Sequence, residues 1–426
     1  MVYFSIEGGE NKLKLSFKFR PKFTEQQLAI IEELSFHTTK IYNIANHICR
    51  EQEYRTYIEL EKELKSNWHN EWLHSHTYQQ CLKVLEQNWK SYFASIKDYK
   101  KNPSKYIGMP KPPKYKNSKD KKNEVIFTNL AIRYQNRVLK LSLSKKMKEK
   151  FQVQSLNFVV ESNKIPVDFS EIQQIKIKWD NSSKEWYLII IYNQQESNIV
   201  KDWSNVMGVD LGLDNIATLT FLNNKECIII DGKRVKSKNS YYNKEIARLT
   251  SIAMKQQGDS KFFKRTKRII KLQKKRNNYM NDFIHKVSKK IIDYAIWNQC
   301  SVIVIGDISG IKQENNIKTF VQIPIQKIID KVKYKAKLAG IEVVLQKESY
   351  TSGCSALDLE EINKKNYNKS RRIQRGLFRS NNGILINADM NGSLNILRKY
   401  TRGIPRAIKF ARDNGFLDNP LRIRVV

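Results

Sequence analysis

Cysteine is scarce in this 426-residue chain, and none of its five cysteines forms a CxxC pair. The five, Cys49, Cys81, Cys227, Cys300 and Cys354, lie far apart, which argues against a disulfide framework and against a zinc ribbon. Long apolar runs are also missing, so we expect no membrane span, and the chain opens on a polar strand rather than a signal peptide. The sequence therefore indicates an intracellular, cytoplasmic protein in a reducing compartment.

Acidic residues are few relative to basic ones, 42 against 77, which gives a net charge of +35. Such an excess raises repulsion within a fold, so a polyanionic partner is the natural explanation. A membrane surface is also anionic, but the sequence has no long amphipathic anchor. The charge therefore favours nucleic acid as the partner, and we expect the protein to associate with the nucleoid.

The first half of the chain is predicted to be a β-rich domain interrupted by helices. Apolar residues alternate with polar ones over 12–19, as in a half-buried strand. Thr24 and Gln27 have the pattern of a capping box, and helical signal continues to about residue 100 with a possible break near Ser66. Strand-like segments then follow at 124–128, 137–143, 156–160, 173–179 and 186–193.

Between the helices and these strands, residues 101–123 hold eight lysines and one aspartate, with several prolines. This composition predicts an exposed linker or a loop that contacts phosphates. Lys111, Lys114 and Lys116 are its candidate nucleic-acid ligands.

The second half is predicted to alternate strands and helices. Its expected order is three strands, long helices, a strand, a helix, a strand and, after an irregular loop, a last helix. These segments are 206–211, 216–221, 226–231, about 241–298, 301–307, 322–339, 341–347 and 389–399. This is the element order of an RNase H-like fold.

Three carboxylates stand at the ends of these elements. Asp210 ends an apolar strand, where a buried carboxylate is costly without a cation or hydrogen-bond partner, although an aspartate that caps a turn is an alternative. Asp389 begins a helix, where it is either a metal ligand or an N-cap. Glu348 follows the strand 341–347, where the alternative is an exposed charge.

Five short segments of the second half form an ordered set: Gly208-Val-Asp-Leu-Gly, Asp282-Phe-Ile-His-Lys-Val-Ser, Tyr334-Lys-Ala-Lys-Leu-Ala-Gly-Ile, Tyr350-Thr-Ser and Asn387-Ala-Asp-Met-Asn-Gly. In this order they resemble the TnpB family of transposon-encoded, RNA-guided nucleases, which is related to the type V CRISPR effectors. The likeness covers almost the whole chain, because the opening strand, the helical insert and the Lys-Pro-Pro-Lys-Tyr-Lys stretch also fit. The resemblance implies a guide RNA that selects a double-stranded DNA target by base pairing.

The chain departs from the family pattern at two places. The glutamate that usually ends the second RuvC strand is replaced by Gly306, and only Cys354 remains of the expected four-cysteine zinc ribbon. Asp307 is a poor substitute, because it points to the opposite face of the strand. In the resembled fold, the Gly306 strand lies between those ending in Asp210 and Glu348, so Glu348 can reach over the glycine.

We therefore predict Asp210, Glu348 and Asp389 as the catalytic and metal-binding residues. Two hard cations, Mg²⁺ or Mn²⁺, can activate water and stabilise the leaving oxygen of a phosphodiester, and they prefer carboxylate ligands. Asp210 is expected to bridge both ions. No zinc is expected, and the loop of about 350–386 is either held together without zinc or partly mobile.

Basic residues continue along the long helices and into that loop. Residues 242–276 contain 12 basic and two acidic residues, and an apolar stripe that includes Phe262 and Val287 leaves most of the cations on another face. A solvated charged face is the alternative to a nucleic-acid contact. The candidate ligands are Lys264, Lys267, Arg268, Lys271, Lys274, Lys275, Arg371, Arg372 and Arg375.

The fold class is thus α/β with separate β and α parts. We expect a β-barrel-like wedge domain (1–22 and 101–204), a helical recognition insert (23–100) and an RNase H-like RuvC domain with a long helical insertion (205–426). The predicted activity is metal-dependent, RNA-guided cleavage of DNA. The alternatives are an RNA-guided repressor that binds without cutting and a recombinase that acts on transposon ends without RNA.

Overall fold

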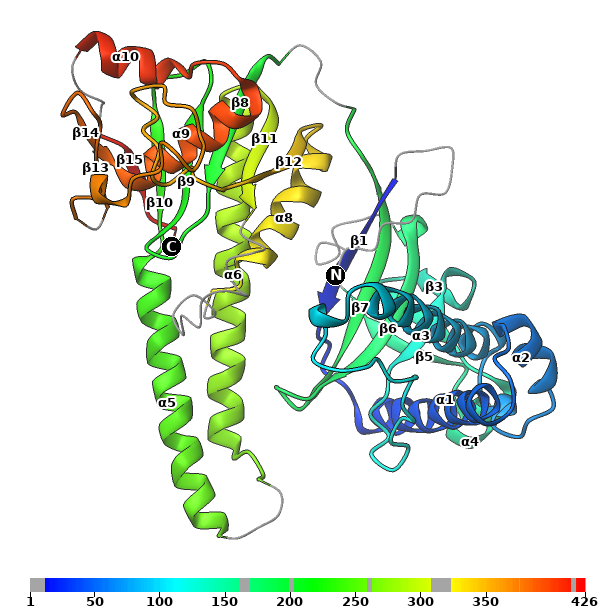
Figure 1. Ribbon diagram of the computed structural model, residues 1–426. Coiled ribbons are helices and arrows are strands. Elements are labelled where there is room, and N and C mark those ends of the chain that lie inside the picture. Colours follow the sequence, from blue (N-terminus) through cyan, green and yellow to red (C-terminus); the bar gives the residue numbers. More distant parts are fainter. Residues whose placement is uncertain are drawn as a thin grey trace. The chain divides into compact units, whose positions relative to one another are not determined.

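The computed structural model describes residues 12–160, 169–198, 203–258, 263–307, 323–374, 376–414 and 419–425. The chain divides into two compact units between Gln194 and Gln195 (Figure 1).

Two sheets and a layer of helices make up the first unit. The strand orders are β1-β7-β6-β2 and β3-β4-β5, so the opening strand pairs with strands that follow the helices. The strands are β1 (Lys12–Phe19), β2 (Val125–Thr128), β3 (Ile132–Gln135), β4 (Val138–Ser142), β5 (Ser155–Val159), β6 (Ile172–Asp180) and β7 (Glu185–Gln195). The helices are α1 (Glu25–Glu51), α2 (Tyr57–Glu63), α3 (Ser75–Lys101) and α4 (Lys145–Phe151).

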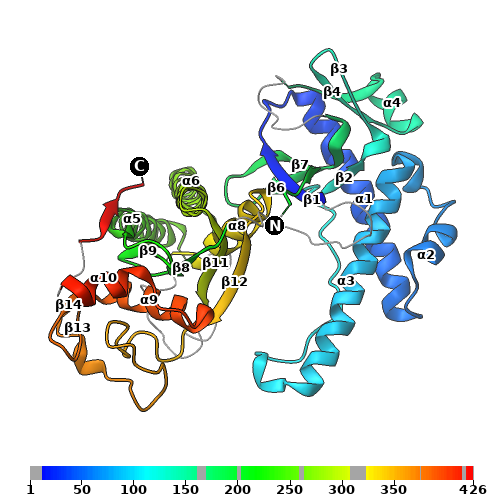
Figure 2. The ribbon, with the colours of Figure 1, turned by 90° about the horizontal axis from the view of Figure 1, so that it is seen from above.

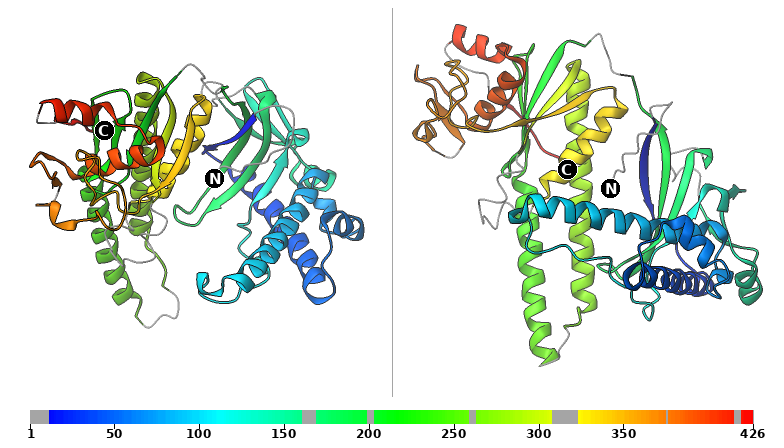
Figure 3. Two further views of the ribbon diagram at one scale, coloured as in Figure 1. Left: turned by 45° about the horizontal axis from the view of Figure 1, so that its top comes forward. Right: turned by 45° about the vertical axis from the view of Figure 1, so that its right-hand side comes forward.

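The helices of this unit pack on its strands rather than forming a separate body. Figure 3 shows α1 and α3 side by side against the strands, and buried residues of the helices and of both sheets belong to one hydrophobic core. The capping box at the start of α1 is confirmed, since the Thr24 side chain accepts from the Gln27 backbone and the Gln27 side chain accepts from the Thr24 backbone. The helical segment therefore begins where the sequence predicted.

A mixed sheet flanked by helices forms the second unit. Its strand order is β12-β11-β8-β9-β10-β15, in which β8, β11 and β12 are parallel and β9 runs antiparallel. The strands are β8 (Asn205–Asp210), β9 (Asn215–Phe221), β10 (Cys227–Asp231), β11 (Cys300–Asp307), β12 (Glu342–Lys347) and β15 (Leu421–Ile423), with a small hairpin of β13 (Leu377–Arg379) and β14 (Leu385–Asn387).

The helices of this unit cover both faces of the sheet. They are α5 (Lys233–Gln257), α6 (Lys267–Trp297), α8 (Ile325–Leu338), α9 (Ala388–Thr401) and α10 (Arg406–Asn414). Figure 2 shows α9 on one face and α6 and α8 on the other, in agreement with their contacts to β8, β11 and β12. In the described residues no helix is both long and apolar enough to cross a membrane.

Some element boundaries differ from the prediction. The first long helix begins at Lys233 and not near 241, because its first turns contribute only Val235 and Asn239 to the buried face and so show little apolar periodicity. The second helix begins at Lys267, and Phe262 of the predicted apolar stripe lies outside the described residues. The short elements α10 and β15 were not predicted, because so few residues show little periodicity.

Candidate active site

The parallel strands β8, β11 and β12 bring the ends carrying Asp210, Gly306 and Glu348 to one edge of the sheet. Ile305 is paired with Val209, so the next residue on each strand, Gly306 and Asp210, face the same way. Gly306 is paired with Gln346, and Glu348, two residues further along, has the same orientation as Gln346. The three positions therefore share the face that α9 covers.

The side chain of Glu348 lies over Gly306. A Cβ atom built on Gly306 would be 2.7 Å from Cδ and 2.8 Å from Cγ of Glu348, and it would overlap Oε1. A side chain at position 306 would therefore displace Glu348. This is the placement that the predicted strand order required.

Helix α9 approaches the sheet closely at two glycines. A Cβ atom on Gly208 would be 2.8 Å from the carbonyl oxygen of Ser393, and one on Gly392 would be 2.5 Å from Oδ2 of Asp210. The hydroxyl of Ser393 also lies 3.1 Å from the carbonyl oxygen of Gly208. This close packing places the first turn of α9, with Asp389, beside the end of β8.

Asp389 is not the N-cap of α9, so the capping alternative is wrong. The cap is Asn387, whose side chain accepts from the backbone of Asp389 at 2.9 Å. The Asp389 carboxylate instead accepts a hydrogen bond from Nδ2 of Asn215 at 2.7 Å and lies 3.9 Å from the guanidinium of Arg372. Arg422 on β15 donates to the oxygen of the same amide at 3.1 Å, which fixes the Asn215 nitrogen toward Asp389.

The carboxylates of the site repel one another in a partly buried position. Burial raises the pKa of Asp210 well above its usual range, the charges of Glu348 and Asp389 raise it further, and Arg372 opposes them. Burial also raises the pKa of Glu348 to about 7, with a further contribution from the charge of Asp307. Oε1 of Glu348 is buried with no hydrogen-bond partner in the described structure. Such an arrangement would be stabilised by cations.

These carboxylates do not form a closed metal site as they stand. Across the described ranges, no three His, Cys, Asp or Glu side chains are gathered closely enough to hold an ion. Asp307 ends β11 and is paired with Lys347. Because it follows Gly306 directly in the strand, its side chain position is on the opposite face of the sheet. Its charge nevertheless acts on Glu348, so this residue is closer to the site electrostatically than the strand pleat alone suggested.

The loop after Glu348 is held together by amides and one carboxylate. Asn391 donates to the carbonyl oxygen of Cys354 at 2.8 Å and accepts from the backbone of Ala356 at 2.9 Å. Asn395, one turn further along α9, donates to the carbonyl oxygens of Thr351 and Cys354 at 2.9 and 2.8 Å. The single cysteine of this loop is buried.

Glu360 is the second anchor of this loop. Its Oε2 accepts from the backbone of Ser355 at 2.7 Å and from the guanidinium of Arg371 at 2.6 Å. Its Oε1 accepts from Asn381 at 2.9 Å, which joins the hairpin to the loop. Hydrogen bonds and an ion pair thus join the described part of this loop, and the expectation that it needs no zinc stays a prediction.

Sequence reasoning missed the residues that support the site and the loop, namely Asn215, Glu360, Asn391 and Asn395. The only local signal was a pair of asparagines at positions 391 and 395, one turn apart on the apolar side of a helix. The three asparagines contact residues at least 35 positions away in the chain, and Glu360 joins residues of an irregular segment, so no periodic pattern identifies them.

The predicted nucleic-acid ligands fall into separate groups. Lys264, Lys267, Arg268, Lys271 and Lys275 are exposed around the start of α6, and Lys274 is half-buried. Lys111 and Lys114 are exposed, whereas the ammonium of Lys116 lies 3.9 Å from the centre of the Tyr42 ring.

The loop arginines have different surroundings. The guanidinium of Arg371 donates to Glu360 and to Asn381, so it stabilises the loop. Arg372 lies at Asp389, and Arg375 lies outside the described residues.

Two family models match the second half of the chain. One, described as a probable transposase (OrfB_IS605), matches residues 189–312, and the other, a Cas12f1-like TNB domain, matches residues 326–396. The second match covers α8, β12, the loop that follows Glu348 and most of α9.

Three similar proteins have names that agree with these family models. The CRISPR-associated endodeoxyribonuclease Cas12f1 of Syntrophomonas palmitatica is 32% identical over 42% of this chain and 36% of that protein. A Cas12f1 of Sulfoacidibacillus thermotolerans is 27% identical over 53% of each chain, so the alignments span only about a third to a half of these two relatives. The TnpB-like protein ORF457 of Acidianus two-tailed virus is 23% identical over 91% of this chain and 86% of that protein.

A solved structure shares the fold. The cryo-EM structure of a Cas12f1–sgRNA–target DNA complex matches with a TM-score of 0.59 at 14% identity, over 88% of this chain and 83% of that one. It shows a mixed α/β fold of the same kind as this chain. By these family models and relatives, the chain is similar to TnpB-like proteins, to a probable transposase and to Cas12f endodeoxyribonucleases.

Proposed function

We propose that this protein is an RNA-guided DNA endonuclease that hydrolyses phosphodiester bonds at the Asp210–Glu348–Asp389 edge of its second unit. The observation that carries the proposal is the placement of Glu348 over Gly306, which brings a third carboxylate to the face where Asp210 and α9 meet. A glutamate that ends an exposed strand has no reason to be partly buried with an unpartnered oxygen.

The second unit is proposed to be an RNase H-like RuvC domain with α5 and α6 as its helical insertion. Its strand order, with an antiparallel β9 beside parallel strands β8, β11 and β12, supports this assignment. In the first unit, β1 joins strands from beyond residue 101, which supports a discontinuous wedge domain that carries α1–α3 as its recognition insert.

Asp210, Glu348 and Asp389 would hold two Mg²⁺ or Mn²⁺ ions. The unpartnered Glu348 oxygen and the mutual repulsion of the carboxylates fit such ions. The bound ions would supply an activated water and stabilise charge on the leaving oxygen. Asn215 and Arg372 orient Asp389, and the glycines at 208 and 392 keep α9 close enough for its carboxylate to join the others.

A guide RNA and a double-stranded DNA target are the proposed partners. The net charge of +35 calls for polyanions, and the exposed lysines at the start of α6 offer phosphate contacts. Contacts of this kind give affinity without choosing a sequence, so base pairing with the guide would supply the choice.

A nuclease-dead, RNA-guided DNA binder is the second candidate. It is favoured by the absence, in the described ranges, of three side chains already gathered around an ion position. It also fits the loss of a carboxylate at Gly306, where the resembled family usually has glutamate.

The test begins with sequencing of the RNA that copurifies with the full chain. A double-stranded target complementary to that RNA is then incubated with the complex and Mg²⁺, with Asp210→Ala as the control. Cleavage by the unchanged protein and none by the variant is the expected result. Binding without cleavage supports the repressor, and ribonuclease-resistant binding with only random RNA supports the recombinase.

A further inference from the structure

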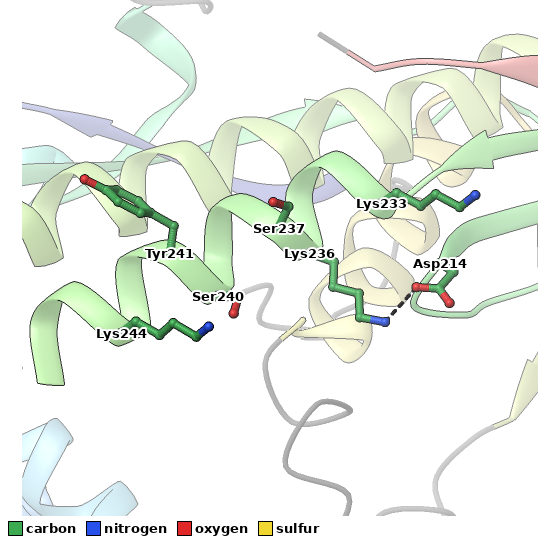
Figure 4. A pocket seen from close by; sticks show the side chains of 7 residues that line it. All are labelled: Asp214, Lys233, Lys236, Ser237, Ser240, Tyr241 and Lys244. Atoms are coloured by element: carbon green, nitrogen blue, oxygen red, sulfur yellow. Dashed lines mark hydrogen bonds and ion pairs between the residues drawn. The ribbon is translucent and has the colours of Figure 1, made fainter.

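A groove runs along α5, next to the loop that follows β8. It is lined by Asp214 and by side chains of the first three turns of α5, namely Lys233, Lys236, Ser237, Ser240, Tyr241 and Lys244 (Figure 4). We call this feature the α5 groove. Three of its residues are lysines, and the only carboxylate in it, that of Asp214, is paired with Lys236.

The groove residues lie on the side of α5 that does not pack on α6. They recur at intervals of three or four, so they share one face of the helix. The opposite face carries buried Val235 and Asn239, and Arg276 of α6 donates to Asn239 at 2.7 Å. Tyr241 is 62% exposed, and Lys233 and Lys244 are exposed as well. These side chains therefore add little to the packing of the unit.

Cations outnumber carboxylates at the start of α5. Its first turn has no acidic residue and contains Lys233, Arg234 and Lys236, while the Asp231 carboxylate just before it accepts from the backbone of Lys233 at 3.4 Å and Asp214 pairs with Lys236. Cations at this end are repelled by the partial positive charge of the unpaired backbone N–H groups. A bound anion would relieve this repulsion, so the local sequence is better suited to a ligand than to helix stability.

The α5 groove and the carboxylate site share a loop. Lys236 Nζ lies 2.7 Å from Oδ1 of Asp214, and the backbone of Gly232 donates to the Asp214 carbonyl oxygen at 2.8 Å. The next residue, Asn215, holds Asp389 through its amide at 2.7 Å. A nucleic-acid strand in the groove would therefore lie next to Asp214 and Asn215, the two residues that connect the groove to Asp389.

We propose that the α5 groove binds single-stranded DNA, as the path by which the cut strand enters or leaves the carboxylate site. Lys233 and Lys244 contact phosphates, and the ring of Tyr241 stacks on a base. The choice of DNA rests on the proposed function. A single strand is inferred because an exposed ring between lysines can stack only on a base that is free of its duplex neighbours.

The length of the groove suits a short stretch of strand. Lys233 and Lys244 are 11 residues apart on one helix, a rise of about 16 Å, which corresponds to roughly three to five nucleotides. Ser237 and Ser240 lie between them and can donate to phosphate oxygens.

The test measures binding of a fluorescent 20-nucleotide oligo-dT to the full chain at several salt concentrations. Tyr241→Ala is expected to weaken binding about fivefold or more, as the loss of one stacked base predicts, whereas Tyr241→Phe keeps the ring and should bind normally. The pair Lys233→Gln and Lys244→Gln should lower the salt slope by about 1.4, at about 0.7 for each lost phosphate contact. The control pair, Lys255→Gln and Lys290→Gln, removes exposed lysines outside the groove and should leave the slope unchanged.

A mapping experiment locates the contact. Ultraviolet crosslinking of the same oligonucleotide carrying 5-bromouracil should label the peptide that contains Tyr241. Equal slopes for the two lysine pairs, or no label on that peptide, would overturn the proposal. Stronger effects of the variants on oligo-U or on duplex DNA than on oligo-dT would also overturn it. None of these readouts needs cleavage, so a chain that never cuts DNA leaves the test intact.

Discussion

Glu348 occupies the space that any side chain at Gly306 would need. The pleat of β11 and its register with β12 give both positions the same orientation, and a Cβ atom at 306 would stand 2.7 Å from Cδ of the glutamate. The glycine and the glutamate therefore form one unit, in which the missing side chain of one strand makes room for the carboxylate of the next. This relationship leads to the first prediction.

Gly306→Ala should lower cleavage strongly, but less than loss of Glu348 itself. The added methyl group must push the carboxylate away, and a displacement of about 1 Å at a catalytic group can cost roughly 100-fold in rate. Gly108→Ala is the control, because a Cβ atom there meets nothing within 4 Å. Cleavage rates and melting temperatures of both variants are compared, and a fully active Gly306→Ala protein would contradict the placement of Glu348 in the working enzyme.

The raised pKa values predict how stability depends on pH in the absence of metal. Because the pKa of Glu348 is raised to about 7, the folded chain binds more protons than the unfolded chain between the ordinary carboxyl pKa and that value. Stability therefore falls as pH rises through this window, and the penalty is complete above it. Glu348→Gln should raise the melting temperature in EDTA at pH 8 by roughly 2–4 °C, with little change at pH 4.5.

Added Mn²⁺ should instead make the melting temperature of the unchanged protein higher than that of Glu348→Gln at pH 8. The ion requires deprotonated carboxylates, so it should stabilise the unchanged protein more at pH 8 than at pH 5.5 and stabilise Glu348→Gln much less. Thermal melts with and without the ion measure both effects. Equal stabilisation of the two proteins at pH 8 would remove Glu348 from the ligands.

The loop of 350–386 should depend on Glu360 and not on zinc. Glu360→Ala breaks the contacts to Ser355, Arg371 and Asn381, and removing hydrogen bonds to a charged group should destabilise the loop by about 2–3 kcal/mol. Glu361→Ala is the matched control, because Glu361 is the next residue in the chain and its own carboxylate is exposed.

Hydrogen exchange should rise in this loop for Glu360→Ala and stay unchanged for Glu361→Ala. A zinc chelator should alter neither the exchange nor the melting temperature of the unchanged protein. Stoichiometric zinc in metal analysis would contradict this prediction.

The strands were predictable from the sequence and the supporting hydrogen bonds were not. Short apolar runs placed β8, β9, β11 and β12 within a residue or two, because a strand buried on both faces, such as β9, is apolar along most of its length. The first turns of α5 bury only two residues, so their periodicity was too weak to read.

For the site, too, the candidate carboxylates could be predicted from the sequence, whereas their hydrogen-bond partners could not. Asp210, Glu348 and Asp389 were predicted from their places at the ends of elements together with the resemblance to the TnpB family, and their catalytic role stays a prediction. Asn215 and Glu360 act across the sheet and the loop, and nothing in their local sequence marks those contacts. Arg371 was assigned to nucleic acid from its charge alone, and its partner Glu360 could be found only in three dimensions.

The exposed lysines around the start of α6 should contribute to nucleic-acid binding. Replacing Lys264, Lys267 and Lys271 with glutamine should lower the salt slope for duplex DNA by about 2–3, at 0.7–0.9 for each contact. Lys286→Gln and Lys289→Gln are the control on the same helix, because each of these lysines pairs with an aspartate one turn away. The same slope for both sets would mean that the α6 lysines face only solvent.

The most decisive test compares variants of Glu348 and Asp307, the two carboxylates that could replace the one missing at Gly306. Glu348→Ala should abolish cleavage of a matched target in Mg²⁺ while target binding survives, because binding rests on backbone contacts and base pairing. Asp307→Ala should retain most activity, since Asp307 occupies the strand position that alternates with Gly306 and acts on Glu348 only through its charge. Loss of that charge should lower the pKa of Glu348, so the acid limb of the Asp307→Ala rate profile should move to lower pH. Full activity in Glu348→Ala together with none in Asp307→Ala would reverse the assignment and make Asp307 the third ligand.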